Sequence, residues 1–337
     1  MDKIIRTICL FSDQVSNQEI EKLEKISQLL QEKGFSIQTK RICLSDYKSQ
    51  IADKELLDKG ILLGLGEQSF EKLKANFADF LKSENKAISL DLTNEDITNE
   101  HIDFLFKIIE NKPDNTFRFT YGFNLPISSP YFPSAKFGKK GFAVGLQPTD
   151  LSENCKSVAE WLEKLKSVWQ EIDSLLKPMD GYLGIDSSIA PLFQGSSSLV
   201  NFVKRLGLDF SHSATTDIYT TISKFIKENN PKPIGLCGLM FPCLEDFELA
   251  EEYEKGNFTV ERNIFLSLHS GLGIDTYPIA VDQNKERVIE ILKLLQKLSS
   301  KYKKPLSARF VSDGKAKIGE KTDFKNQYLK DVIIREL

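Results

Sequence analysis

The chain has few cysteines and no paired cysteine motif. Five cysteines are widely spaced among 337 residues, with neither a Cys-x-x-Cys motif nor a zinc-ligand pattern. We therefore expect no disulfide scaffold or zinc module, and a reducing, cytoplasmic setting is the simplest interpretation. Long apolar runs are also missing. No stretch is long enough to cross a bilayer, and the apolar run near the N-terminus is too short for a secretory signal, so we expect no membrane partner.

Neither sign of charge dominates the chain. The 45 basic and 48 acidic residues give a formal net charge of −3, and no basic stripe interleaved with aromatic residues stands out. Nucleic acid is therefore not an expected partner. The hydrophobic share of 41% and the charged share of 28% are those of an ordinary globular protein. No linker, low-complexity segment or strong repeat divides the sequence. We predict a single domain over 1–337, and its length is compatible with two similar halves of about 1–150 and 151–337.

Strand-like and helix-like segments alternate along the chain, which is typical of an α/β fold with a largely buried sheet. Strand composition is found at 4–11, 35–44, 61–65, 87–92, 117–123, 141–146, 181–186, 233–239 and 305–311. Helical spacing of apolar residues follows a capping box at Ser16 and Glu19, and it recurs at 70–81, 97–109, 152–176, 197–206, 216–228, 259–269 and 284–302. Three prolines exclude a helix from the loop 124–136.

The run 268–278 concentrates residue types that bind small molecules and transfer protons. It holds two glycines, Gly271 and Gly273, next to Ser270 and Asp275. Glycine allows close backbone approach, while serine and aspartate donate, accept or carry protons. The run lacks the third glycine of a dinucleotide fingerprint and the Gly-Lys-Ser/Thr of a P-loop. We predict a small-molecule site here, with a tight helix-to-strand turn as the structural alternative.

Two further segments place polar residues where a strand ends or a helix begins. Asp186 closes a predicted strand, and in α/β folds ligands bind at the carboxyl ends of strands. A turn capped by Asp186 is the alternative. His212, Ser213 and Thr215 precede a predicted helix, whose free amides attract anions, and His212 can exchange a proton near neutral pH. A purely structural cap is equally compatible with this second segment.

Asp246 and Arg309 complete the candidates that come from local pattern. Asp246 and its neighbour Glu245 form a carboxylate pair that could bind a divalent cation, act as a base, or only complement a helix dipole. Arg309 is a lone arginine in an apolar predicted strand, and it needs a partner because an unpaired buried charge is costly. It would clamp a ligand carboxylate or phosphate, or pair with Asp186 or Asp275 for structure alone.

Taken in order, these segments resemble the family called domain of unknown function 711. The matching stretches are 186–191, 207–216, 238–246, 271–278 with Asp282, and 306–324, with weaker likeness at 124–135 and 143–148. The resemblance spans most of the chain and is strongest after residue 180. It implies a fold similar to the pyruvate formate-lyase (glycyl radical enzyme) barrel, in which two parallel halves pack antiparallel inside a layer of helices. We therefore expect a ten-stranded α/β barrel with a site inside it or at its mouth.

Two departures from the relatives shape the expected chemistry. Glycyl radical enzymes carry the radical glycine in an Arg-Val-x-Gly-aromatic loop, whereas this chain has Arg-Phe-Val-Ser-Asp-Gly at 309–314 and no adjacent cysteine pair. No glycyl radical is therefore expected. Many family members have cysteine where this chain has Ser270, which puts a thiol-dependent step at that position in doubt.

The leading hypothesis is a small-molecule enzyme with a buried polar site for an anionic, carboxylate-bearing substrate, acting by non-radical acid/base or metal-assisted chemistry. The predicted acid/base or cation-binding residues are Asp186, His212, Asp246 and Asp275. The predicted substrate-binding residues are Asn124, Ser213, Thr215, Ser270, Gly271, Gly273 and Arg309. A divalent cation, a homo-oligomer and roles for His269 and the cysteines stay open. The alternative is a non-catalytic protein that binds a metabolite or metal for regulation or sensing.

Overall fold

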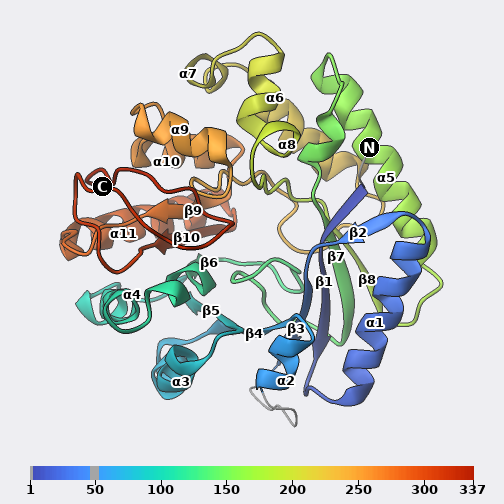
Figure 1. The fold of residues 1–337 in the computed structure, drawn as a ribbon, viewed down its shortest axis with the longest axis horizontal. Helices are drawn as coiled ribbons and strands as arrows, with labels where there is room; N and C mark the ends of the chain where they lie inside the picture. Colours follow the sequence, from blue (N-terminus) through green and yellow to red (C-terminus); the bar gives the residue numbers. More distant parts are fainter. Residues whose placement is uncertain (1–2, 46–52) are drawn as a thin grey trace.

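The computed structural model describes residues 3–45 and 53–337, and these form a mixed α/β fold around a ten-stranded sheet (Figure 1). Strands such as β7, whose six residues are all buried, are apolar along their whole length, as expected for strands covered on both faces. The strands are β1 (Lys3–Ser12), β2 (Phe35–Ile37), β3 (Lys40–Leu44), β4 (Ile61–Gln68), β5 (Lys86–Asp91), β6 (Phe119–Phe123), β7 (Gly141–Leu146), β8 (Tyr182–Asp186), β9 (Gly273–Pro278) and β10 (Leu306–Val311).

The sheet consists of three parallel groups joined by two antiparallel contacts. Its strand order is β8-β7-β1-β3-β4-β5-β6-β10-β9, and β2 pairs with β1 outside this path. Strands β1, β3, β4, β5 and β6 run parallel, as do β7 with β8 and β9 with β10. The polarity reverses between β1 and β7 and between β6 and β10. In the described residues the ladder is not closed by hydrogen bonds, and β8 and β9 form its two ends.

The segment 233–242 lies between these two ends and touches both. It forms isolated parallel bridges to Ile185 and Ile189 on the β8 side and to Gly271 and Asp275 on the β9 side. The sequence predicted a strand over 233–239, but the structure has only these bridges. Prolines that lack an amide donor, and Gly235 with a φ of +75°, interrupt the extended ladder there.

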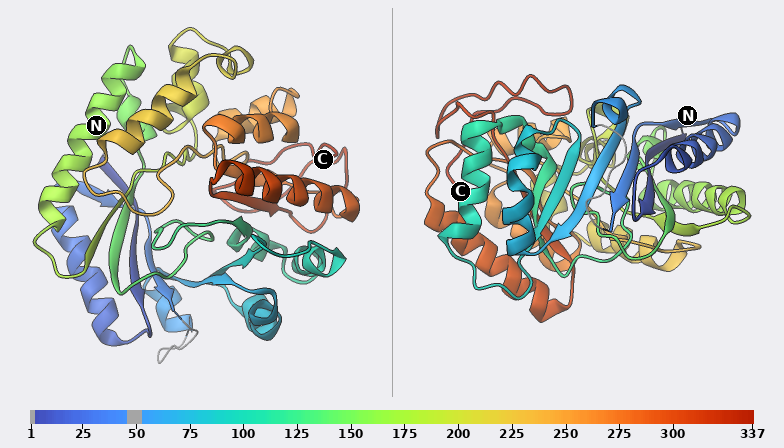
Figure 2. Two further views of the ribbon diagram at one scale, coloured as in Figure 1. Left: turned by 180° about the vertical axis from the view of Figure 1, so that it is seen from behind. Right: turned by 90° about the horizontal axis from the view of Figure 1, so that it is seen from below.

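The helices surround the sheet (Figures 1 and 2). Their apolar faces and the outer face of the sheet form the largest buried cluster of the molecule. No helix within residues 3–45 and 53–337 has the length and apolar character needed to cross a membrane. The α-helices are α1 (Asn17–Glu32), α2 (Asp53–Asp58), α3 (Phe70–Lys82), α4 (Asn99–Asn111), α5 (Val158–Leu176), α6 (Leu199–Arg205), α7 (Phe210–Ser213), α8 (Ile218–Asn229), α9 (Phe247–Glu254), α10 (Val260–His269) and α11 (Lys285–Tyr302), and the 3-10 helices are η1 (Pro113–Arg118), η2 (Thr149–Ser152) and η3 (Gly195–Ser197).

Three segments differ in detail from the elements expected from the sequence. The expected strand 35–44 is divided into β2 and β3, which pair with successive parts of β1. The helix expected from residue 152 begins at Val158, because Ser157 accepts a hydrogen bond from the amide of Glu160 and thereby caps the helix. The glycine-containing run after residue 270 contains a full strand, β9, which gains its hydrogen bonds from the distant strand β10.

The loop between β6 and β7 lies at the centre of the molecule, inside the curve of the sheet (Figure 1). Glycines on the strands leave room for it. A Cβ added at Gly64 of β4 would lie 2.6 Å from the Phe132 ring, and one added at Gly145 of β7 would lie 2.7 Å from Tyr131. These distances are too short for real contacts, so the missing side chains are what admits the loop.

Candidate functional site

A cavity of about 310 Å³ is lined by residues of the parallel block β1-β3-β4-β5-β6 and of the oppositely directed strands β9 and β10. The parallel block contributes residues at or near the amino ends of its strands. Strands β9 and β10 run in the opposite direction and contribute Asp275 and Arg309 from within their length. The polar and charged lining includes Arg6, Gln38, Thr39, Arg41, Asn85, Arg118, Tyr131, Ser134, Glu245, Asp275, Arg309 and Tyr328.

Arg309 of β10 forms the centre of a buried ion cluster at this cavity. Its Nε donates to Oδ1 of Asp275 at 2.6 Å, and its Nη2 donates to Oε2 of Glu245 at 2.6 Å. Its Nη1 donates to the carbonyl of Phe117 at 3.2 Å. Burial lowers the pKa of Arg309, but the charges of Asp275 and Glu245 outweigh burial and raise that pKa above its ordinary value. Arg309 therefore keeps its positive charge near neutral pH.

Arg6 of β1 extends this cluster across the cavity. Its Nη2 donates to Oε1 of Glu245 at 3.1 Å, so that Glu245 accepts from Arg6 through one oxygen and from Arg309 through the other. Asp275 differs from Glu245, because its Oδ2 has no hydrogen-bond partner among the described residues. Asp275 can therefore accept a proton or a hydrogen bond from a ligand in the cavity.

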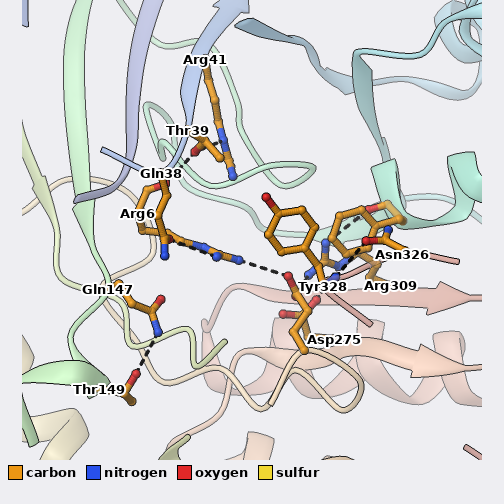
Figure 3. Close-up of polar contacts among 12 residues, drawn as sticks. Arg6, Gln38, Thr39, Arg41, Gln147, Thr149, Asp275, Arg309, Asn326 and Tyr328 are labelled. Atoms are coloured by element: carbon orange, nitrogen blue, oxygen red, sulfur yellow. Dashed lines mark hydrogen bonds and ion pairs between the residues drawn. The ribbon is translucent and has the colours of Figure 1, made fainter. Parts of the chain in front are cut away.

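Arg41 of β3 reaches into the same space as Arg6 and Tyr328 (Figure 3). It is 7% exposed, and its side chain donates only to Thr39 Oγ1 at 3.1 Å and to the carbonyl of Pro130 at 3.3 Å. No described carboxylate pairs with it. Burial, followed by the charge of Arg6, lowers the pKa of Arg41 to about 10. Arg41 still carries its charge at neutral pH. The charge of Glu245 acts on it, but no described carboxylate forms an ion pair with it.

Arg118, at the end of η1, borders the cavity beside Phe117. Its Nη2 donates to the carbonyl of Ser83 at 2.9 Å and also contacts Asn115, while its Nη1 is buried without a partner in the part of the chain that the structure describes. Burial lowers the pKa of Arg118 to about 10. Four arginines thus face two carboxylates across the lining, which leaves two positive charges in excess.

Much of the remaining wall is apolar or aromatic. Leu62 and Ala87 come from the starts of β4 and β5, and Phe132 and Pro133 come from the central loop. Tyr131 is tied to the protein by donating to the carbonyl of Leu146 at 3.0 Å. Such a surface favours a small organic molecule with an apolar body and anionic groups.

The comparisons with known proteins agree with the resemblance in the sequence. The model of the family described as "Uncharacterised ACR (DUF711)" matches residues 79–326, which is more than half of the chain. The chain belongs to the DUF711 family. No curated protein matches it. The DUF711 match includes Arg118, Glu245, Asp275 and Arg309, while Arg6, Arg41 and Tyr328 lie outside it.

Of the residues predicted from sequence, Asp275 and Arg309 meet at the cavity of this DUF711 protein. Asp186 does not line it. Its carboxylate is fully buried and accepts hydrogen bonds from the hydroxyls of Ser129 and Ser188 and from the amides of Leu236 and Cys237. Burial raises the pKa of Asp186. Its contacts attach the central loop to the segment 233–242.

Asp246 lies one residue away from the cavity lining and faces elsewhere. It caps α9 by accepting from the amide of Leu249 at 3.3 Å, and it accepts from the amide of Leu199 at 3.0 Å. Burial raises the pKa of Asp246 to about 7. The cavity carboxylate of this pair is Glu245, and local sequence could not distinguish the two.

The predicted anion-binding segment before α8 is separate from the cavity. His212 and Thr215 are exposed at α7, and the buried Ser213 hydroxyl contacts the carbonyl of Phe210 and the hydroxyl of Tyr219. They do not line the cavity because α7 belongs to the outer layer of helices. Asn124 is exposed as well, and its side-chain Nδ2 donates to Ser299 Oγ at 2.9 Å.

The glycine run around residue 271 serves strand packing in the DUF711 fold. A Cβ at Gly273, where φ is +111°, would lie 2.1 Å from the carbonyl oxygen of Ser307 on β10. Gly271 packs against the backbone of Ser267, and the buried Ser270 hydroxyl contacts Nδ1 of His269 at 2.8 Å. These residues therefore position Asp275 on β9, although they do not line the cavity themselves.

No three described His, Cys, Asp or Glu side chains gather as the ligands of a metal ion. At the cavity, both carboxylates are already contacted by Arg309. Sequence reasoning missed Arg6 of β1 and Arg41 of β3. Both strands are mostly apolar, but each also contains a lysine, so neither arginine is as isolated in its strand as Arg309 is in β10.

Proposed function

We propose that this DUF711 protein binds a small carboxylate-bearing molecule in the cavity and converts it by non-radical acid/base chemistry. The observation that carries the proposal is Arg41, a buried cation that faces the cavity and has no described carboxylate partner. An unneutralised buried charge is costly, and a ligand carboxylate placed against its planar fork would remove that cost.

In this proposal Asp275 acts on the bound molecule. Its Oδ2 is unoccupied by described protein donors, while Arg309 holds Oδ1 and fixes the orientation of the carboxylate. Asp275 would take a proton from the substrate and return it, and Glu245, held by Arg6 and Arg309, would maintain the position of both arginines.

The test uses Arg41→Gln, with Arg287→Gln as the matched control. Arg287 pairs with Glu261 and Glu290 on the surface, so the control removes one positive charge away from the cavity. Thermal shift and calorimetry with acetate, succinate and citrate would show binding to the wild type and to Arg287→Gln, and a loss of at least about tenfold in Arg41→Gln. Equal affinity in all three proteins would overturn the proposal.

A second candidate is a binding protein without turnover. It is favoured by the engagement of Glu245 by two arginines, which leaves Asp275 as the single carboxylate of the described lining with a free oxygen. Asp275→Asn separates the two candidates. If the protein is an enzyme, Asp275→Asn should keep ligand binding and lose product formation. If it is a binding protein, neither the wild type nor Asp275→Asn should form a product.

We also propose that the open sheet is a form of the pyruvate formate-lyase-like barrel, in which the segment 233–242 takes the place of a strand between β8 and β9. Its support is the strand order, the two polarity reversals and the isolated parallel bridges on both sides of the segment. The backbone amides of Ile234, Met240 and Cys243 donate to carbonyl oxygens of neighbouring segments. Their hydrogen exchange would be slow in a closed barrel and fast in an open one.

We propose a cytoplasmic location for the protein, since all five cysteines are free.

A further inference from the structure

The cavity is lined by a second arginine, Arg118, that forms no ion pair with a described carboxylate, although the charges of Asp114 and Glu84 act on it. Arg118 precedes β6, whereas Arg41 lies near the start of β3. Three inter-strand steps separate these strands in the sheet order β3-β4-β5-β6. At about 4.8 Å a step, the two backbones are roughly 14 Å apart. Long side chains from both positions border the same cavity.

The surface between the two arginines is apolar. The starts of the intervening strands supply Leu62 and Ala87, and the aromatic rings of Phe117 and Phe132 line the same space. The Phe132 ring centroid is 5.0 Å from Cζ of Arg41, so this ring reaches the arginine at one end of the apolar surface. The site thus has two cationic ends and an apolar middle.

We propose that the ligand is a dicarboxylate whose two carboxylates sit at the two ends of the cavity, one against Arg41 and the other against Arg118, with an apolar chain between them. This inference rests on the proposed function for its first carboxylate and adds the second. The buried Nη1 of Arg118, which has no described partner, is the donor that the second carboxylate would satisfy. Each charge-assisted pair contributes more than a neutral hydrogen bond, so a ligand with both groups binds more tightly than one with either alone.

The experiment compares straight-chain dicarboxylates from succinate to sebacate with monocarboxylates of the same chain length, using calorimetry on the full chain. We expect affinity to peak at one intermediate length and to fall at least about tenfold when one carboxylate is replaced by a methyl group. In Arg118→Gln the best dicarboxylate should bind no better than its monocarboxylate, and monocarboxylate affinity should be unchanged. Arg41→Gln should weaken both ligands.

Arg118 also bonds to Ser83 and Asn115, so a variant at this position can lose stability. Arg118→Lys keeps the charge and serves as the second variant, and circular dichroism monitors folding in each case. In Arg118→Lys part of the preference for the dicarboxylate should remain. If monocarboxylates bind through Arg41 but a second carboxylate adds nothing, or if Arg118→Gln weakens both ligands equally, this inference is wrong and the proposed function stands. If no carboxylate binds, the proposed function itself fails.

Discussion

Removing Arg309 should destabilise the protein far more than removing a surface arginine. In Arg309→Met, Asp275 loses its only ion-pair partner among the described residues, and Glu245 keeps Arg6 alone. The side chains of Arg309, Glu245 and Asp275 are 8%, 5% and 6% exposed, so solvent replaces the lost contacts only in part. Breaking a buried ion pair by removing one partner costs about 3–5 kcal/mol, and we expect a loss in that range at pH 7.

The control is Arg287→Met, which removes pairs to Glu261 and Glu290 that are about two-thirds exposed. The corresponding side-chain exposures are 68% and 67%. Surface pairs of this kind contribute about 0–1 kcal/mol, so the free energy of unfolding of the control should decrease by less than about 1 kcal/mol. Urea unfolding of wild type, variant and control, followed by far-ultraviolet circular dichroism, measures the free energy of unfolding in each.

A double variant tests the cause of this loss. Arg309→Met combined with Asp275→Asn should recover part of the lost stability, because no uncompensated charge is then left at Asp275. A loss under about 1 kcal/mol in Arg309→Met, or no recovery in the double variant, would show that the cluster is not the buried network described above.

Three other outcomes are expected. Gly64→Ala should lower stability by about 1–3 kcal/mol through overlap with Phe132, and Phe132→Leu should partly rescue it; a neutral Gly64→Ala would place the central loop elsewhere. Burial raises the pKa of Asp246 to about 7, so its contribution to stability is full at acid pH and is lost as the pH rises through about 7. Urea unfolding at a series of pH values up to and through about 7 should show this decrease in the free energy of unfolding for the wild type and not for Asp246→Asn, and the same decrease in both proteins would contradict the prediction. His212→Ala should change stability by less than about 0.5 kcal/mol and leave ligand affinity unaltered, because the ring is exposed outside the cavity; lost binding would move the site to α7.

Local sequence was informative about the elements and less so about the site. Helical and alternating periodicities depend on residues close in the chain, and they located the long helices and most strands to within a few residues. The Arg309 pattern raised two alternatives, a ligand clamp and a structural pair with an aspartate. The structure has the pair with Asp275, which stands at the cavity wall, so the two alternatives are compatible.

The predicted site residues that lie away from the cavity have one physical feature in common. His212, Asp186 and Asp246 are polar residues at turns and caps, and their local surroundings look the same whether they serve a ligand or the backbone. Their hydrogen bonds in the structure go to backbone amides or neighbouring hydroxyls, or, for His212, the side chain faces solvent. Burial and direction decide between these roles, and neither is a property of the local sequence.

The sequence by itself determined the alternation of strands and helices, the family membership and the presence of a lone arginine that requires a partner in an apolar strand. Only the tertiary structure decided which charges share a space. The two antiparallel contacts, β1 with β7 and β6 with β10, bring the amino ends of one set of strands beside the carboxyl ends of the other. Arg6, Arg41 and Arg118 thereby face Glu245 and Asp275, because the partner of a buried charge is set by neighbours across strands and not along them.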